Sequence, residues 1–373
     1  MPQIFGKDFT RRELARHVGD FDQLFGVILL THGDGTARGA RVLQFRTGSG
    51  LAFDVNVDRC MDIASLDYRG VPLGWRSPTG PRNPWLHEAD GELGLGWLRS
   101  FSGIMNTCGL DHIMAPTEES AEHYNYPHRS KVRHGIHGRI AYTPARLRGY
   151  GVDWQGDDAV LWAEGEVRQA AMFGENLLLE RRIEAEVGSD SVIVHDKVTS
   201  LGFYPTPHAM LYHVNFGWPL VAAGTKLVAP IKATPFMVHD PSATEIGAIE
   251  QAEPQTGFSE QVYQHEVAME PDGTVPLALV NERQGADGFG VLYEYDGKAM
   301  PALVQWQNLQ EGNYVLGLEP ATVKAGSRED WKARDELIWL DHGDSRSYRL
   351  RLTPFADAAT RWDVETRVSK LTS

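Results

Sequence analysis

The sequence has few cysteines, a shortage of basic side chains and no long hydrophobic run. Cys60 and Cys108 are its only cysteines among 373 residues, too few for a disulfide scaffold and with a spacing that fits no zinc motif. We expect both thiols to be reduced and buried, as in cytoplasmic proteins. No stretch approaches the roughly 18–20 apolar residues of a membrane span, and residues 1–8 have neither the basic nor the apolar region of a secretory signal. These absences predict a cytoplasmic protein without a membrane segment.

Basic side chains are outnumbered, with 36 Lys and Arg against 50 Asp and Glu, and the net charge is −14. A negative chain repels phosphate backbones and anionic surfaces unless it carries a dense basic patch. The closest candidate, residues 128–133, holds three Lys and Arg beside its histidine, too few for a nucleic-acid groove. We therefore expect neither nucleic acid nor membrane as a partner. The sequence leaves the oligomeric state open, a homodimer included.

Strand patterning dominates what is present. Disorder is excluded because 42% of the residues are hydrophobic, with 10 Trp, 14 Phe and 12 Tyr. In residues 51–58 the odd positions are apolar and the even ones small or polar, which indicates a half-buried strand. Residues 47–50 join it to residues 41–46 as a hairpin. Similar reasoning predicts five more strands: 177–187, 192–198, 302–309, 314–319 and 348–353.

Helix is expected mainly at the start of the chain. Thr10 and Glu13 have the spacing of a capping box, and apolar residues follow at helical spacing: Leu14, Val18, Phe21 and Phe25. No internal repeat or Pro/Ser-rich linker divides the chain. We therefore predict an all-β protein, a large antiparallel β-sandwich over residues 40–373, with residues 1–39 as a helical decoration and one domain overall.

Polar residues within two apolar strands are candidates for chemistry. His213 and Asn215 share one face of the strand 211–217, because strand side chains alternate, and they can hydrogen-bond a polyhydroxy ligand. A core histidine bonded to a backbone carbonyl is the competing interpretation. Glu319 ends the strand 314–319, where burial against apolar surface would raise its pKa and suit a general base. A solvated strand-end glutamate is the alternative there.

A third candidate is a histidine-rich stretch that contains His112, His123, His128, His134 and His137. Its spacing matches no zinc pattern such as His-Glu-x-x-His, and no cysteine lies near enough to assist. We interpret it as the polar wall of a sugar cleft rather than a metal site. The sequence also lacks a phosphate loop, a Gly-x-Gly-x-x-Gly turn and a Gly-x-Ser-x-Gly elbow, so neither a nucleotide cofactor nor α/β-hydrolase chemistry is predicted.

Five short motifs follow one another along residues 40–355: Arg59-Cys60-Met61-Asp62, Thr107-Cys108-Gly109-Leu110, His137-Gly138-Arg139, residues 212–217 and Leu318-Glu319-Pro320. Their order resembles that of one branch of the aldose 1-epimerase (galactose mutarotase-like) family. No motif is specific alone, but five in the right order are hard to obtain by chance. The chain departs from that branch at Cys60, where Gly is usual, and at residues 102–103, where Ser-Gly replaces Gly-Gly.

The resemblance implies a β-supersandwich with an open sugar cleft and a reaction that needs no metal or organic cofactor. In the family, a Glu removes the anomeric hydroxyl proton while a His protonates the ring oxygen, and the opened ring recloses as the other anomer. Carried over by motif, Glu319 is the base and His213 the acid, two groups that can exchange roles near neutral pH. The residues then expected to contact the sugar substrate are His137, Arg59, Asn215, Asp62 and Trp306. For Trp306, an ordinary core tryptophan is the alternative.

Other functions remain open on the same fold, since fold does not determine function. One is a non-catalytic carbohydrate-binding or regulatory protein. Another is a carbohydrate lyase or hydrolase, although hydrolysis usually needs two carboxylates, and Asp62 is the only partner for Glu319 in a recognisable motif. The sugar is not specified: the negative net charge disfavours a phosphosugar, whereas Arg59 or Arg139 would suit an acidic one.

Overall fold

Antiparallel strands form most of the regular structure. The structure is a computed structural model and describes residues 1–88, 91–238, 245–284 and 288–372. Its largest sheet contains eight strands, in the spatial order β11 (Arg146–Gln155), β12 (Asp158–Ala170), β13 (Asn176–Glu186), β14 (Val192–Ser200), β25 (Ser345–Phe355), β21 (Phe289–Asp296), β20 (Thr274–Asn281) and β17 (Lys226–Val228). All seven pairings in this sheet are antiparallel, as the predicted fold class requires.

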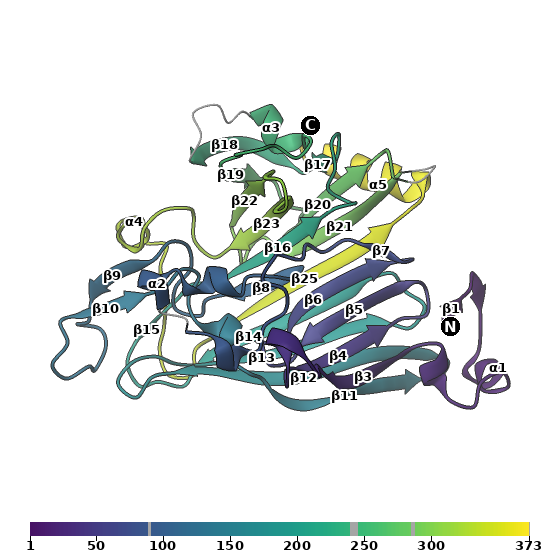
Figure 1. The fold of residues 1–373 in the computed structure, drawn as a ribbon, viewed down its shortest axis with the longest axis horizontal. Coiled ribbons are helices and arrows are strands. Elements are labelled where there is room, and N and C mark those ends of the chain that lie inside the picture. Colours follow the sequence, from purple (N-terminus) through teal and green to yellow (C-terminus); the bar gives the residue numbers. More distant parts are fainter. Residues whose placement is uncertain (89–90, 239–244, 285–287, 373) are drawn as a thin grey trace.

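Two smaller sheets complete the layers. A six-stranded sheet has the order β18 (Ile231–Val238), β19 (Gln261–Val267), β22 (Ala302–Asn308), β23 (Val315–Ala321), β16 (Leu211–Gly217) and β8 (Met105–Cys108). A five-stranded sheet has the order β3 (Gly26–Thr31), β4 (Arg41–Arg46), β5 (Leu51–Asn56), β6 (Asp62–Tyr68) and β7 (Val71–Pro72). In Figure 1, β3 to β6 lie in front of β12 to β14.

The remaining elements are short. Three two-stranded pairs are formed by β1 (Gln3–Ile4) with β2 (Lys7–Asp8), β9 (Thr117–Ser120) with β10 (Lys131–His134), and β15 (Thr206–His208) with β24 (Ile338–Leu340). The α-helices are α1 (Arg11–Ala15), α2 (Gly91–Gly94), α3 (Glu245–Ile249), α4 (Arg328–Ala333) and α5 (Ala358–Ser369). Within the described residues, none of these helices has the length and apolarity that crossing a membrane requires.

The main apolar core lies between the large sheet and the two smaller ones. Leu179 and Ile183 of β13, Phe53 of β5 and Val214 of β16 belong to one cluster of buried side chains, and each is at most 1% exposed. Fully burying such a side chain contributes about 1.5–3 kcal/mol. Burial of the apolar strand faces that alternation predicts therefore stabilises the packing of the sheets on one another.

The strands predicted from alternation are confirmed. The hairpin at residues 41–58 is β4 paired with β5, and the hairpin at residues 177–198 is β13 paired with β14. The three remaining predicted strands are β22, β23 and β25. Cys60 and Cys108 are free and buried, as expected.

The N-terminal helix is shorter than its apolar spacing suggests. The capping box of Thr10 and Glu13 is present, but α1 ends at Ala15. The side chain of Asp20 then caps a separate 3₁₀ turn at residues 21–23, and the chain continues into β3, so residues 1–39 are not only helical. The longest described helix is α5, at the other end of the chain. The sequence patterns did not predict it.

The six-stranded sheet is covered on both faces. Every residue of β16 and β23 is buried, which explains why both strands are nearly continuous apolar runs. One face joins the main core, and the other carries a second apolar cluster that includes Trp97, Phe101 and Trp331. Polar side chains on this second face are therefore enclosed by apolar cover.

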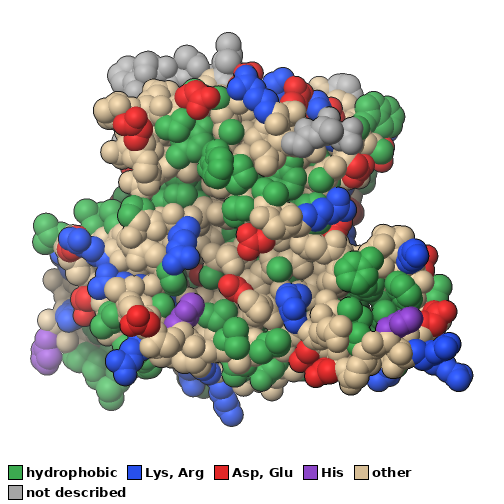
Figure 2. Space-filling model, turned by 45° about the vertical axis from the view of Figure 1, so that its right-hand side comes forward, with side chains coloured by type: hydrophobic (Ala, Val, Ile, Leu, Met, Phe, Trp, Pro, Cys, Tyr) green, Lys and Arg blue, Asp and Glu red, His purple; other side chains and the backbone are tan. Residues whose placement is uncertain are grey.

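On the described part of the molecular surface that Figure 2 shows, Lys and Arg side chains are interspersed with Asp and Glu.

Candidate active site

His213 and Glu319 face each other across two neighbouring strands. The pairing of β16 with β23 sets Val214 against Leu318 and Asn215 against Gly317, and the same register brings His213 opposite Glu319. His213 Nε2 lies 3.1 Å from Glu319 Oε1, and the two side chains are 4% and 3% exposed. The structure thus brings together two residues about a hundred positions apart in the sequence.

Gly317 makes room for this contact. A Cβ atom at this position would lie 2.9 Å from Glu319 Oε1 and 3.1 Å from His213 Cε1, closer than side-chain atoms normally approach. A glycine inside a strand often marks such a close approach. Any larger residue at position 317 would push the two side chains apart.

The pair forms the floor of a cavity of about 410 Å³ on the second face of the six-stranded sheet. This volume lies within the range of about 300–1,000 Å³ that is usual for small-molecule sites. Four of the sixteen described lining residues are ionisable: His137, His213, Glu260 and Glu319. The cavity therefore combines a small polar floor with largely apolar walls.

Aromatic rings enclose the imidazole of His213. Its ring centre lies 4.7 Å from that of Phe101, 5.4 Å from Trp306 and 5.8 Å from Trp97. The imidazole of His137 approaches to 5.5 Å. This surrounding is dry and contributes hydrophobic contact, so it favours uncharged forms of the side chains on the floor.

The two floor residues have pKa values displaced in opposite directions. Burial raises the pKa of Glu319 well above its ordinary value, and the nearby carboxylate of Glu260 raises it further. Burial lowers the pKa of His213 well below its ordinary value, and His137 adds to that effect. Burial also lowers the pKa of His137, to about 3. Both shifts favour the uncharged forms of the pair, in which the shared proton resides on Glu319.

Several polar atoms on the floor have no hydrogen-bond partner among the described residues. They are Nδ1 of His137, Nδ1 of His213 and, apart from its contact with His213, Oε1 of Glu319. Buried polar groups are nearly always hydrogen-bonded in folded proteins. These three atoms belong to residues that line one cavity, and they leave hydrogen-bonding capacity beside it for a ligand with hydroxyl or ether oxygens.

Of the other predicted contact residues, His137 and Trp306 line the cavity. His137 follows β10, and its backbone N donates to Met114 O at 2.9 Å, joining two segments of the wall. Trp306 of β22 donates from Nε1 to Glu260 Oε2 at 2.8 Å. Trp306 is thus a wall residue rather than a core tryptophan.

Arg59 and Asp62, also predicted to contact the sugar, are not among the described residues that line the cavity. Arg59 lies behind the wall, where NH1 donates to Ser100 O at 2.6 Å. Asp62 lies between the sheets, where Oδ1 accepts from Thr107 Oγ1 at 2.6 Å and from Arg181 NH1 at 2.8 Å. The turn between β5 and β6 carries both residues inward, so their motif supports the core beneath the site.

Asn215 also lies outside the cavity lining, although it shares the face of His213. Its backbone N bonds to Ile104 O and its backbone O accepts from Trp75 N, so chain segments cover this end of β16. Its Nδ2 donates to Gly103 O at 3.1 Å. The side chain therefore holds the segment at Gly103 and also interacts with the side chain of His213.

Glu260 and Trp97 are among the lining residues that the sequence did not single out. Glu260 directly precedes β19 and belongs to none of the recognised motifs, and Trp97 lies in a segment that carries no strand or helix periodicity. Trp97 stacks on Phe101 with ring centres 3.9 Å apart. Only the tertiary arrangement brings these residues beside the pair.

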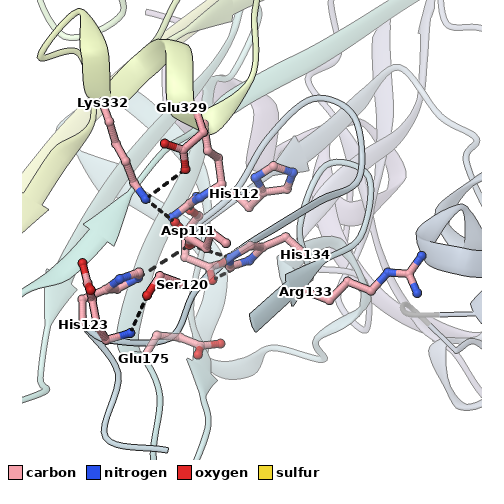
Figure 3. Close-up of polar contacts among 12 residues, drawn as sticks. Asp111, His112, Ser120, His123, Arg133, His134, Glu175, Glu329 and Lys332 are labelled. Carbon is pink, nitrogen blue, oxygen red and sulfur yellow. Dashed lines mark hydrogen bonds and ion pairs between the residues drawn. The ribbon is translucent and has the colours of Figure 1, made fainter. Parts of the chain in front are cut away.

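The rest of the histidine-rich stretch corrects another expectation. His112, His123 and His134 lie in a buried cluster of charged side chains beside α4 (Figure 3), not on the cavity wall. His134 Nε2 lies 2.8 Å from Glu119 Oε1, and its Nδ1 lies 3.5 Å from Asp111 Oδ2. Among the residues that the structure describes, no group of three or more His, Cys, Asp and Glu is arranged to hold a metal ion. We call the group of Asp111, Glu119, His134, Arg328 and Lys332 the charged cluster.

Ion pairs keep the charged cluster ionised. Arg328 NH2 lies 2.7 Å from Glu119 Oε1, and Lys332 Nζ lies 2.9 Å from Glu119 Oε2. Burial alone would raise the pKa of Glu119, but hydrogen bonds with His123 and His134 and the charge of Arg328 lower it overall. Burial alone would lower the pKa of His134, but its contacts with Asp111 and Glu119 raise it overall.

The charged cluster anchors segments that form the cavity wall. Arg328 NH1 donates to Asp111 O at 2.5 Å, which ties α4 to the loop before Met114. His134 ends β10, two residues before the lining residue Ile136. Residues 325–326, also in the wall, directly precede α4. The cluster therefore fixes the wall from behind without contacting the cavity itself.

A second groove, of about 470 Å³, lies over the opposite, solvent-facing side of the eight-stranded sheet. Its charged side chains pair with one another: Arg182 contacts Glu164 at 2.6 Å and Glu184 at 2.8 Å. Such mutual pairing is typical of a solvated sheet face. The smaller, apolar-walled cavity is the stronger candidate for a site.

Comparisons with known proteins agree with the fold. The model of one family, described as a domain of unknown function (DUF4432), matches residues 37–353. No curated protein sequence matches the chain. Among solved structures, the chain is similar to a provisionally assigned aldose 1-epimerase from Klebsiella pneumoniae, with a TM-score of 0.83 and 24% identity over 95% of this chain and 91% of the other.

Two further structures have the same architecture at lower identity. A galactose mutarotase-like protein from Clostridium acetobutylicum matches with a TM-score of 0.57 and 13% identity, over 88% of this chain and 99% of the other. A galactose 1-epimerase from Lactobacillus acidophilus matches with a TM-score of 0.53 and 11% identity, over 89% and 99%. The chain has the galactose mutarotase-like fold, as its motif order predicts.

Proposed function

The chain belongs to the DUF4432 family, and we propose that it is a sugar mutarotase, an isomerase that interconverts the anomers of an aldose without a cofactor. The observation that carries the proposal is the buried contact of 3.1 Å between His213 and Glu319 on the floor of a cavity. Anomerisation needs one group that takes a proton and one that gives a proton, each within about 2.6–3.2 Å of the sugar atom concerned. Two adjacent titratable groups meet that need.

In the proposed reaction, Glu319 accepts the proton of the anomeric hydroxyl while His213 donates a proton to the ring oxygen. The bond between the anomeric carbon and the ring oxygen breaks, and an open-chain aldehyde forms. Rotation about the adjacent carbon–carbon bond presents the other face of the aldehyde. The two proton transfers then run in reverse, and the ring closes as the other anomer.

The protonation of the free site supports this cycle. The uncharged pair and the carboxylate–imidazolium pair contain the same number of protons, so neither form requires exchange with solvent. A hydrogen bond from the anomeric hydroxyl to Glu319 favours the charged carboxylate. Sugar binding therefore moves the shared proton to His213, which becomes the acid that the first step needs.

The other residues have supporting parts in this proposal. His137, with Nδ1 unpartnered, binds a ring hydroxyl, and Trp306 packs against the C–H face of the sugar. Arg59, Asp62 and Asn215 stabilise the scaffold and do not contact the sugar. Two free, buried cysteines support a reducing compartment such as the cytoplasm.

The test is exchange NMR or polarimetry with purified protein over neutral and acidic sugars. Interconversion of anomers above the spontaneous rate is expected for at least one sugar. Glu319→Gln should lower that rate about 100- to 10,000-fold, the usual contribution of acid–base catalysis, with the fold unchanged by circular dichroism. His213→Asn should lose less, because solvent can partly supply the proton. A Glu319→Gln rate near that of the wild type would contradict the proposal.

A second candidate has one observation in its favour. Glu260 and Glu319 both line the cavity, and glycoside hydrolysis usually employs two carboxyl groups. Release of nitrophenol from nitrophenyl glycosides tests it directly. Hydrolysis that requires both Glu260 and Glu319, without catalysed anomer exchange, would favour this candidate over the mutarotase.

A further inference from the structure

We propose that the sugar bound in this cavity is a neutral deoxy sugar whose exocyclic carbon is a methyl group instead of a hydroxymethyl group. The inference rests on the proposed function, because it places the anomeric hydroxyl at Glu319 and the ring oxygen at His213. It goes further by naming the substrate class from the imbalance between polar and apolar groups in the lining.

Among the described residues, the lining offers few side-chain partners for hydroxyl groups. Of the four ionisable side chains described there, His213 and Glu319 are occupied by the ring oxygen and the anomeric hydroxyl. Glu260 already accepts a hydrogen bond from Trp306 at 2.8 Å. His137 and the remaining acceptor positions of Glu260 are left for all the other hydroxyls. A 6-deoxy sugar carries one hydroxyl fewer than the parent aldohexose, so it requires fewer hydrogen-bond partners from these few side chains.

The exocyclic carbon, which carries no hydroxyl in the deoxy sugar, is expected to face the apolar part of the lining. In a pyranose, the carbon that bears the exocyclic group is bonded to the ring oxygen, so this group lies beside His213. The rings of Phe101 and Trp306 surround His213 at 4.7 and 5.4 Å. The walls are completed by aliphatic side chains, among them Leu98, Met114, Ile136, Val262 and Val304. A methyl group packs against such a surface, whereas a hydroxyl without a partner is disfavoured there.

The charge of the lining selects a neutral sugar. Glu260 and Glu319 contribute two carboxyl groups, and no Lys or Arg is among the described lining residues. The guanidinium of Arg59 is turned away, bonded to Ser100 O behind the wall. A carboxylated or phosphorylated sugar would therefore enter beside acidic groups without a cation to balance its charge.

The experiment compares sugars that differ by the exocyclic hydroxyl alone: L-fucose with L-galactose, L-rhamnose with L-mannose, and D-quinovose with D-glucose. Binding is followed by fluorescence of the cavity tryptophans, and turnover by exchange NMR. For at least one pair, the deoxy sugar should have a kcat/KM about 10- to 100-fold higher and bind correspondingly more tightly, the discrimination that an apolar pocket achieves against an added hydroxyl. Glucuronate and glucose phosphates should not bind.

Two variants test where the discrimination arises. Phe101→Tyr and Val304→Thr each add one hydroxyl to the lining, and at least one should lower the preference for the deoxy sugar about 10-fold. Phe203→Tyr makes the same change on an exposed ring, 83% accessible and outside the cavity lining, and should leave the preference unchanged.

The outcomes separate this inference from the proposed function. Equal or better binding and turnover of the parent hexoses would overturn the deoxy preference and leave the mutarotase in place. Preferential binding of a deoxy sugar without catalysed exchange would keep the ligand class and overturn the mutarotase. No binding by any of the deoxy sugars would overturn the inference.

Discussion

The cavity floor and the charged cluster both bury histidine beside carboxyl groups, yet their protonation states are opposite. On the floor, the pKa of Glu319 is raised and that of His213 is lowered, and both shifts favour the uncharged forms. In the cluster, the pKa of Glu119 is lowered and that of His134 is raised, so both are charged. The two regions have the same residue types and similar burial, so the opposite pKa shifts must come from the groups that surround each pair.

The difference lies in the number of opposite charges within contact. Glu119 has His134, Arg328 and Lys332 within 2.9 Å. In the described structure, the one basic side chain in contact with Glu319 is His213, whose own surroundings are aromatic. Burial alone neutralises a titratable pair, whereas burial with sufficient countercharge keeps it ionised. The first arrangement leaves a transferable proton, as the proposed reaction requires, and the second anchors the segments of the cavity wall.

Removing a charge from the cluster should have the largest effect on stability. Glu119→Gln leaves Arg328 and His134 with less countercharge in a buried site, which typically costs about 3–5 kcal/mol. Urea unfolding measures the change. Glu118→Gln, at the exposed neighbouring position, is the matched control and should change little. Equal stability of the two variants would show that the cluster does not hold the wall.

The same chemical change on the floor should have the opposite sign. Glu319→Gln replaces a carboxyl group, whose charged form burial disfavours, by a neutral amide of similar shape. The free energy of unfolding at neutral pH should rise by about 0.5–2 kcal/mol, as at other sites where function opposes stability. Urea unfolding beside Glu119→Gln makes the comparison direct. Destabilisation by both variants would remove the contrast between the two regions.

The two buried histidines should give opposite pH dependences of stability. A raised pKa means that His134 contributes stability fully below its unfolded pKa of about 6.5, and that this contribution is lost as pH rises through its folded pKa. A lowered pKa means that His213 costs stability once pH falls below about 6.5. Comparing wild type with His134→Gln and His213→Gln from pH 5 to 9 should give slopes of opposite sign, each at most about 1.4 kcal/mol per pH unit.

Sequence patterns predicted the strands and the fold class better than they predicted the residues that line the cavity. Alternation located the hairpins because strand faces are imposed by local burial. The motif order indicated that His213 and Glu319 meet, and the register of β16 with β23 brings them opposite. Helix α5 was not predicted, because Val364 and Val368 are its only buried residues.

Other site residues were misplaced for a tertiary reason. Asp62 and Arg59 belong to a recognisable motif, but the chain turns inward there, and the direction of a turn is not encoded by residue type. Glu260 reaches the cavity from outside any motif, because pairing of β19 with β22 places it near Trp306. Which residues from distant parts of the sequence become neighbours depends on the packing of the whole chain, and local sequence patterns do not report it.

A double-mutant cycle tests whether His213 and Glu319 work as one acid–base unit. Exchange NMR of the best sugar is measured with wild type, His213→Asn, Glu319→Gln and the double variant. Residues that act together lose activity non-additively, so the double variant should be no slower than Glu319→Gln, itself reduced about 100- to 10,000-fold. Losses that multiply in the double variant, or a Glu319→Gln rate close to that of the wild type, would contradict the account.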